Sequence, residues 1–216
     1  MTNAFILDYA RSPFAQASNG ALAVIRPDDL LAGVIRALVA RSGLSAAQIE
    51  DVLVGCAFPD GEQGLNLGRI VGLLAGVPQS AGGVTINRWC GSSMNAIQLA
   101  AGSIAMGAGG LFLAGGVESM SRVPMMGFNP MPNPTWTEDL RHSYLNMGIT
   151  AENLAKRYDI DRATQDQFAL ASHKKATAAR EDGRLAQEIV AAAAPAETSP
   201  RTVPSAPMPR PKSSPP

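Results

Sequence analysis

Apolar residues recur along the first 118 residues of the chain with two kinds of spacing. Short apolar runs that are bounded by Gly, Pro or charged residues are typical of buried strands. Longer stretches in which apolar residues return every three to four positions are typical of helices. The expected strands lie at 4–10, 51–58, 83–87 and 111–116, and the expected helices at 27–42, 66–75 and 92–106. Their alternation predicts an α/β fold with a mainly parallel sheet.

No charged side chain occurs between Arg88 and Glu118, so the helix predicted at 92–106 has no charged face. A helix of this kind has to be covered on all sides, and we expect it in the middle of a layered protein. Gly, Asn, Gln and Ser interrupt the same stretch too often for a membrane span, and no membrane association is expected.

The pattern changes after residue 118. Residues 119–148 are rich in Met, Pro and Asn and have little periodicity, which predicts a long excursion or lid. Helices are expected near 149–158 and 161–182. The stretch 191–216 contains eight of the 16 prolines and no Gly, Leu, Ile or aromatic residue, so it is expected to be disordered. The expected domains are a core at 1–118, a second part at 119–190 and a tail at 191–216.

The composition is that of an ordinary globular protein, with 216 residues of which 46% are hydrophobic and 17% are charged. Eighteen basic and 18 acidic side chains give no net charge, and there is no basic stripe, so nucleic acid is not an expected partner. The two cysteines have neither a disulfide-framework pattern nor a metal-ligand spacing, which favours a reducing compartment and no metal. The N-terminus lacks the basic region of a signal peptide, and we expect a cytoplasmic protein.

Cys90 stands where a predicted strand and turn lead into a predicted helix. Backbone N–H groups and the helix dipole at such a position stabilise a thiolate, and they can also stabilise an oxyanion on a carbonyl under attack. Cys90 is then either a nucleophile or a buried structural thiol. Cys56, inside the run at 51–58, fits a small core hydrophobe. His142 in a polar loop and His173 on a helix have no context that predicts a catalytic base.

The glycine cluster GAGG at 107–110 invites a nucleotide-binding interpretation. However, it precedes the strand predicted at 111–116, whereas a phosphate-binding loop follows a strand and opens a helix. The cluster therefore does not predict a nucleotide site.

Two segments, at 86–102 and 114–125, read INRWCGSSMNAIQLAAG and AGGVESMSRVPM. They closely resemble the acyl-enzyme segment of the thiolase family, in its degradative 3-ketoacyl-CoA thiolase or acetyl-CoA acyltransferase branch. The segments ARSPF, YLNMGITAENLAKRYDI and TQDQFALASHKKATAA are also similar to thiolase segments. The resemblance runs from about residue 4 to about residue 190. It implies the βαβ-rich N-terminal half of a thiolase-like layered fold, followed by part of a loop domain.

The resemblance implies that Cys90 is the catalytic nucleophile, which takes the acyl group of a 3-ketoacyl-CoA as a thioester while acetyl-CoA leaves. The reverse reaction is a Claisen condensation. CoA thioesters are then the substrates, fatty acid β-oxidation is the implied pathway, and no cofactor is implied. The excursion after Ser119 is implied to receive CoA, with Met147 near the acyl pocket as a substrate-binding residue. The family also implies a homo-oligomer.

Four thiolase elements have no counterpart in this sequence: an Asn-containing loop, a Gly-His-Pro histidine, a second catalytic cysteine and the glycines beside it. We expect that the chain is truncated or frameshifted near residue 190. Residues 203–213, back-translated and read one nucleotide earlier, permit a thiolase-like segment that begins Gly-Thr-Ile-Arg-Pro. An inactive fragment is therefore the alternative to an acyltransferase. A ketoacyl synthase fits less well, because the segments around Cys90 are thiolase-like.

Overall fold

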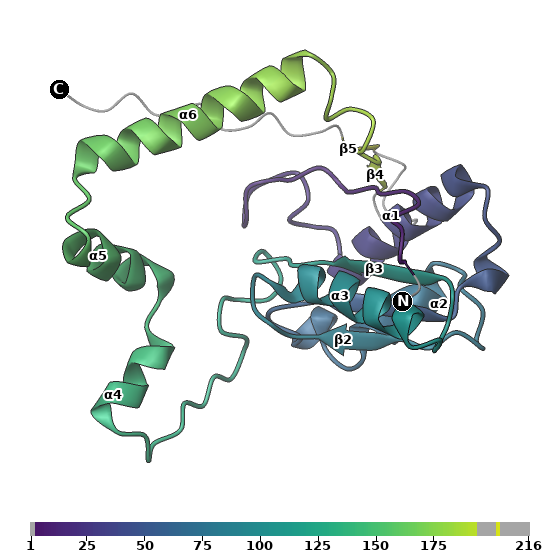
Figure 1. Cartoon of the computed structure of the whole chain (residues 1–216), viewed down its shortest axis with the longest axis horizontal. Helices are drawn as coiled ribbons and strands as arrows, with labels where there is room; N and C mark the ends of the chain where they lie inside the picture. Colours follow the sequence, from purple (N-terminus) through teal and green to yellow (C-terminus); the bar gives the residue numbers. More distant parts are fainter. Residues whose placement is uncertain (1–2, 194–201, 204–216) are drawn as a thin grey trace. The chain divides into compact units, whose positions relative to one another are not determined.

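A computed structural model of the chain describes residues 3–193 and 202–203 (Figure 1). The chain forms two compact units. The first contains the residues up to Asn129 and the segment that starts at Glu188, and the second contains Pro130–Gln187. The domain boundaries expected from the sequence at 118 and 190 stay a prediction.

A three-stranded parallel sheet forms the centre of the first unit. Its middle strand is β1 (Asp51–Gly55), with β2 (Val84–Ile86) on one side and β3 (Phe112–Gly116) on the other. Helix α2 (Leu67–Leu74) connects β1 to β2, and α3 (Ser92–Ala105) connects β2 to β3. The two connections run in opposite directions along the sheet, so right-handed crossovers place α2 and α3 on opposite faces. The predicted α/β class with a parallel sheet is confirmed.

The side chains of β1 alternate between two hydrophobic cores, one on each face of the sheet. Val52 and Val54 belong to the core formed with α2 and with α1 (Pro27–Ser42). Leu53 belongs to the core on the opposite face, formed with α3. The first core also contains Ala32, Ile35, Leu67 and Val71, and the second contains Ile86, Ala96 and Ala100.

Helix α1 begins and ends where the sequence predicts. Pro27 occupies its first turn, which also carries two aspartates, and Gly43 follows it in the left-handed region with φ 70°. The predictions at 66–75, 83–87, 92–106 and 111–116 are each confirmed to within one residue at either end. The strand predicted at 51–58 ends at Gly55, because the chain turns away from the sheet after the Cys56 N–H has donated to the Ile86 carbonyl at 3.0 Å.

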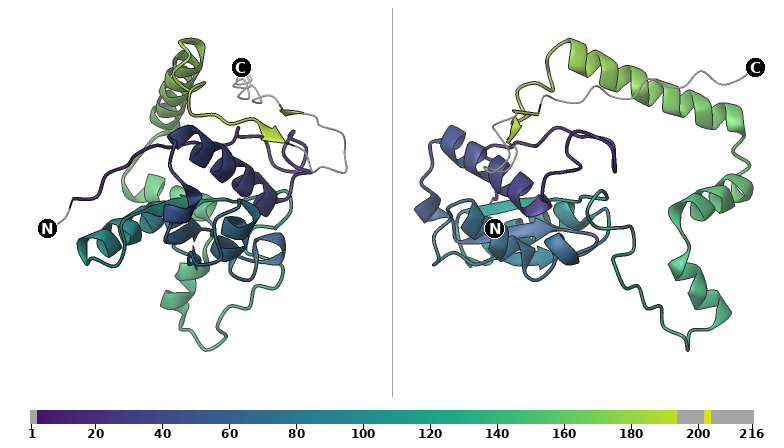
Figure 2. Two further views of the ribbon diagram at one scale, coloured as in Figure 1. Left: turned by 90° about the vertical axis from the view of Figure 1, so that its right-hand side faces the viewer. Right: turned by 180° about the vertical axis from the view of Figure 1, so that it is seen from behind.

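The strand expected at 4–10 is wrong. Residues 3–10 have no regular structure, and Figure 2 shows them as an irregular trace. Phe5, Ile6 and Leu7 are 66–76% exposed. An apolar run becomes a strand only where its backbone pairs with another strand, and the sheet order β2-β1-β3 contains no strand from this segment. The first pairing of this segment is at Arg11, whose N–H donates to the Glu188 carbonyl at 2.8 Å.

Helix α3 is covered on only one face by the described residues of the first unit. Ser92, Ala96 and Ala100 are buried, whereas Met94 is 66% and Ile97 is 45% exposed. The expectation that this uncharged helix is covered on all sides is therefore not met within this unit. Its small buried residues let the helix axis approach the sheet closely.

Within residues 130–187, the second unit consists of helices and their connections. The helices are α4 (Glu138–Arg141), η3 (His142–Tyr144), α5 (Met147–Arg157) and α6 (Arg162–Glu181). Asn146 caps α5 by accepting from the Ile149 N–H at 2.9 Å, and Asp161 caps α6 by accepting from the Thr164 N–H at 2.7 Å. The helices predicted near 149–158 and 161–182 are confirmed, and α4 and η3 lie inside the predicted excursion.

The tail predicted at 191–216 lies mostly outside the described residues, as does the frameshift expected there. The structure describes 191–193 and 202–203, where β4 (Ala192–Ala193) pairs antiparallel with β5 (Thr202–Val203). No helix among the described residues has the length and apolar character needed to cross a lipid bilayer.

Candidate active site

The three strands of the sheet are parallel, so their carboxyl ends meet at one edge. The loop after β1 carries Gln63, the loop after β2 carries Cys90, and the loop after β3 carries Glu118. The connections that leave β1 and β2 run to opposite faces of the sheet. In open α/β sheets, ligands bind outside the carboxyl ends of the strands at such a switch point. The candidate site therefore lies at this edge.

Cys90 lies in a tight turn between β2 and α3, which we call the Cys90 turn (residues 87–92). The Gly91 N–H donates to the Arg88 carbonyl at 3.0 Å, and the Ser92 N–H donates to the Trp89 carbonyl at 3.1 Å. The buried Ser92 hydroxyl accepts from the Arg88 N–H at 2.8 Å and donates to the Trp89 carbonyl at 2.6 Å. These bonds close the turn and leave the Cys90 side chain exposed.

Trp89, directly before Cys90, has a φ of 49°. A residue other than glycine seldom adopts this left-handed conformation, which costs about 1–3 kcal/mol and persists only where neighbouring groups hold it. The strained backbone conformation of this turn therefore lies at the residue directly before Cys90.

Two glycines at the strand ends allow α3 to begin close to the sheet. A Cβ atom on Gly55 would lie 2.5 Å from backbone atoms of Ser92 and Ser93, and one on Gly116 would overlap the Ser93 hydroxyl. Only glycine fits at these two positions. Sequence reasoning did not single out Gly55 or Gly116, although a glycine at the end of a strand that faces a helix was the available signal.

The 14-residue helix α3 has Gly91 as its N-cap and no side-chain cap. Its first backbone N–H groups and the positive end of its dipole therefore lie at the Cys90 turn. This end of the helix can stabilise negative charge that develops on a sulfur or on a carbonyl oxygen.

Gln63 connects the loops after β1 and β3. Its side chain is fully buried, its Nε2 donates to the Phe58 carbonyl at 2.9 Å and to Glu118 Oε1 at 2.6 Å, and its Oε1 accepts from the Ser119 N–H at 2.6 Å. Glu118 Oε2 also accepts from the Ala57 N–H at 2.6 Å. Sequence reasoning missed both side chains, because 55 residues separate them.

Cys56 is 1% exposed, which confirms the burial expected from the sequence, but its neighbours are polar. Its sulfur lies 3.4 Å from Gln63 Nε2 and 3.8 Å from Glu118 Oε1. Burial, and after it the negative charge of Glu118, raise the pKa of the Cys56 thiol to about 12. Cys56 is therefore protonated at neutral pH, which leaves Cys90 as the accessible thiol.

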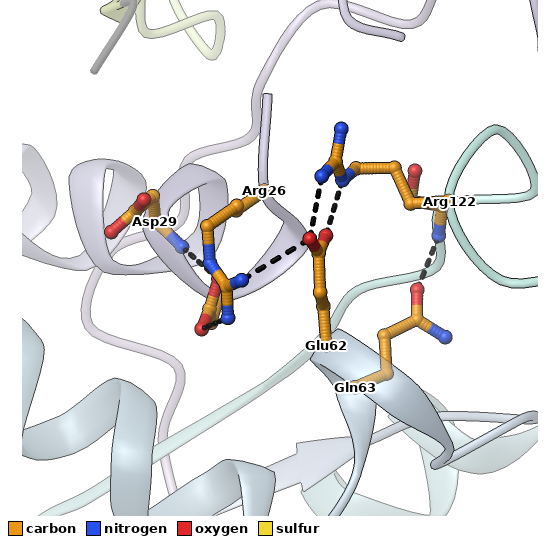
Figure 3. A network of polar contacts seen from close by, with 7 residues as sticks. Arg26, Asp29, Glu62, Gln63 and Arg122 are labelled. Carbon is orange, nitrogen blue, oxygen red and sulfur yellow. Dashed lines mark hydrogen bonds and ion pairs between the residues drawn. The ribbon is translucent and has the colours of Figure 1, made fainter. Parts of the chain in front are cut away.

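Figure 3 shows an ion-pair network beside Gln63, in which Glu62 pairs with both Arg122 and Arg26. Arg26 NH1 lies 3.1 Å from Glu62 Oε1, and its NH2 lies 2.7 Å from the buried Asp28 carboxylate. The hydrogen bond from Arg122 holds the pKa of Glu62 below its ordinary value. The network fastens the start of α1 and the loop after β3 to the loop that contains Gln63.

A cavity of about 380 Å³ lies between α1, residues 10–17 and the carboxyl ends of β1 and β3. Its lining includes Leu31, Val34, Val52 and Glu118, but Cys90 is not among the residues that line it. The exposed Cys90 side chain therefore lies outside this cavity.

The other residues singled out by the sequence lie in the second unit. Met147 is the first residue of α5 and is 71% exposed, and His142 and His173 are exposed. The substrate-binding role expected of Met147 stays a prediction. The stretch 3–129 contains no histidine.

Gly107 and Gly109 have φ values of 72° and 145° and form the turn between α3 and β3. The GAGG cluster therefore lies in the connection that precedes strand β3. This order agrees with the sequence-based argument against a phosphate-binding loop. Among residues 3–193 and 202–203, no group of three or more His, Cys, Asp or Glu residues could hold a metal ion.

Residues 4–214 match the family model described as the thiolase N-terminal domain. The chain is 44% identical to the 3-ketoacyl-CoA thiolase of Bacillus subtilis (strain 168) over 190 residues, which cover 88% of this chain and 49% of that protein. It is 44% identical over 185 residues to the protein of the same name from Psychrobacter cryohalolentis, covering 86% of this chain and 47% of the relative. A third protein of this name, from Saccharophagus degradans, is 42% identical over 187 residues, which cover 86% of this chain and 48% of that relative. The chain spans about half the length of these curated relatives.

Proposed function

Because the chain belongs to the thiolase family, we propose that Cys90 is the nucleophile of a thiolase acyl transfer. The Cys90 sulfur attacks the C3 carbonyl of a 3-ketoacyl-CoA, and the bond between C2 and C3 breaks. The acyl group stays on the sulfur as a thioester, and the enolate of acetyl-CoA takes up a proton and leaves. The thiol of a second CoA then removes the acyl group, which regenerates Cys90.

The observation that carries this proposal is the placement of Cys90, an exposed thiol at the N-terminus of α3. Negative charge develops on the sulfur before the attack and on the substrate oxygen during it, and the helix N-terminus favours both. Cys56 is not a competing candidate, because it is buried and its pKa is raised to about 12.

The proposed substrates are CoA thioesters, and this chemistry requires neither a metal nor a cofactor. On the family basis we also propose that Met147 contacts the acyl chain and that the residues after Ser119 receive CoA. A cytoplasmic location, a place in fatty acid β-oxidation and a homo-oligomer have the same basis.

The second candidate is a chain that accepts an acyl group at Cys90 but does not turn over. It is favoured by the absence of any histidine from 3–129 and by the exposed positions of His142 and His173. A missing general acid or base typically costs a factor of about 10²–10⁴ in rate.

Mass spectrometry after incubation with an acyl-CoA tests the proposal. We expect the acyl mass on the peptide that contains Cys90, no adduct in Cys90→Ala, and an unchanged adduct in Cys56→Ala. A chain that remains unmodified at Cys90 would exclude the acyl-transfer function. A Cys90 adduct, together with no release of shortened acyl-CoA when the chain is given a 3-ketoacyl-CoA and CoA, would select the second candidate.

A further inference from the structure

A continuous series of hydrogen bonds runs from the buried Gln63 to the residue before Cys90. Gln63 Nε2 donates to Glu118 Oε1 at 2.6 Å, and Glu118 Oε2 accepts from the Ala57 N–H at 2.6 Å. The Ala57 carbonyl in turn accepts from Asn87 Nδ2 at 3.0 Å, and Asn87 Oδ1 accepts from the Trp89 N–H at 3.0 Å. We call the side chains of Gln63, Glu118 and Asn87 the Gln63 strut. It joins the loops that follow all three strands.

The buried end of the strut permits only one orientation of the Gln63 amide. Both Nε2 protons have acceptors, in Phe58 and Glu118, and Oε1 accepts from the Ser119 N–H. Rotation of the amide by 180° would set the NH₂ group against the Ser119 N–H and the oxygen against two acceptors. The carboxylate of Glu118 is therefore held in a fixed position by a group that cannot turn.

The exposed end of the strut acts on Trp89. Asn87 Nδ2 donates to the Ala57 carbonyl in the loop after β1, and Asn87 Oδ1 accepts from the Trp89 N–H. The Phe58 ring meets the Trp89 ring edge to face, with 5.3 Å between the ring centroids. The Asn87 contact lies within the Cys90 turn, but Asn87 itself is bound to the Ala57 carbonyl in the loop after β1. The Phe58 contact comes from that loop, where Gln63 binds the Phe58 carbonyl.

Trp89 needs such support, because its φ of 49° is unfavourable for a residue other than glycine. If Trp89 relaxed to a negative φ, the direction of the chain at Cys90 would change and the sulfur would leave the end of α3. A nucleophile misplaced by about 1 Å can lose about 10²-fold in rate.

We propose that Gln63, Glu118 and Asn87 are positioning residues that keep Trp89 left-handed and thereby fix Cys90 at the N-terminus of α3. They act through the backbone of Ala57 and Trp89. The consequence for acyl transfer rests on the function proposed above for Cys90.

The variant Asn87→Ala cuts the strut at its exposed end, where a loss of folding is least expected. Asn66→Ala is the matched control, because Asn66 makes the same pair of bonds elsewhere: its Nδ2 donates to the Gly83 carbonyl at 2.7 Å and its Oδ1 accepts from the Arg69 N–H at 3.3 Å. Asn87→Asp retains an acceptor for the Trp89 N–H, so its acylation rate should lie between those of Asn87→Ala and the wild-type chain. Gln63→Ala tests the buried end.

Three readouts apply to each variant: hydrogen exchange of the peptide spanning the Cys90 turn, the rate at which an acyl-CoA acylates Cys90, and the rate at which iodoacetamide alkylates it. We expect Asn87→Ala to accelerate exchange in the turn and to slow acylation about tenfold or more. Iodoacetamide approaches a thiolate from many directions, so its rate should change less than about twofold when it is measured at an alkaline pH at which thiols ionise without help from a helix N-terminus. Alkylation of the buried Cys56 reports any variant that has unfolded.

If Asn87→Ala matches Asn66→Ala in both turn exchange and acylation, the proposal is wrong. Equal losses in acylation and in iodoacetamide reactivity would also overturn it, because they would indicate general damage. If the wild-type chain takes up no acyl group while exchange still rises only in Asn87→Ala, the support of Trp89 stands and the function proposed for Cys90 fails.

Discussion

Gly55 at the end of β1 is in such close contact with Ser92 at the start of α3 that an added Cβ would lie 2.5 Å from the Ser92 carbonyl carbon. The contact joins the middle strand of the sheet to the helix that carries Cys90. The distance of α3 from the sheet is therefore set by a residue 35 positions before the cysteine.

Gly55→Ala should destabilise the chain, because the added Cβ could be accommodated only if the first turn of α3 moved away from the sheet. Overpacking of this kind typically costs about 1–3 kcal/mol. Urea unfolding measures the loss. Gly115→Ala is the control, since a Cβ on Gly115 would meet nothing within 4 Å, and it should cost much less. Equal midpoints for the two variants would show that the Gly55 contact is not tight in solution.

The raised pKa of Cys56 predicts a loss of stability in alkaline solution. The thiol of an unfolded chain ionises near pH 8.5, whereas in the folded chain the pKa is about 12. Above the unfolded value the unfolded state binds fewer protons, so the contribution of Cys56 is fully present below about pH 8.5 and declines as the pH rises toward 12.

Unfolding of the wild-type chain and of Cys56→Ala, compared between pH 7 and pH 10.5, isolates this effect from the titration of lysine and tyrosine. The difference in unfolding free energy between the two proteins should shrink as the pH rises. A difference that stays constant over this range would mean that Cys56 is not shielded from ionisation in the folded state.

The Glu62 network predicts a loss of stability in acid. The hydrogen bond from Arg122 lowers the pKa of Glu62, so its contribution is present above the ordinary glutamate pKa of about 4.3 and is lost as the pH falls below it. At pH 7 we expect Glu62→Gln to cost roughly 0.5–1 kcal/mol, since the partners are partly exposed. Unfolding at pH 7 and at pH 3 measures the difference, which should be smaller at the lower pH. A cost of the same size at pH 3 would assign the effect to packing and not to charge.

The parts of the fold that local signals determine could be predicted from the sequence. Pro27 and Gly43 mark the ends of α1, Asp161 caps α6, and the change from strand to helix places Cys90 at a helix N-terminus. These features depend on residues within one or two turns of one another, which a sequence displays directly.

The parts that depend on distant residues could not be predicted. The run at 4–10 has the composition of a strand, but a strand also requires pairing with a distant strand, and this segment pairs with none of the strands in the sheet β2-β1-β3. The bond between Gln63 and Glu118 spans 55 residues, and no local spacing indicates it. Sequence reasoning singled out Cys90 but not the side chains of Gln63 and Glu118.

Exchange of an acyl group between an acyl-CoA and isotopically labelled CoA tests most directly whether Cys90 forms the proposed thioester. The Cys90 sulfur takes the acyl group and releases one CoA, and labelled CoA then removes the acyl group as labelled acyl-CoA. Neither step requires cleavage of a carbon–carbon bond. We predict that the wild-type chain and Cys56→Ala incorporate label at similar rates and that Cys90→Ala incorporates none above the uncatalysed background. Label incorporation by Cys90→Ala at the wild-type rate, or none by the folded wild-type chain, would contradict the assignment of Cys90 as the nucleophile.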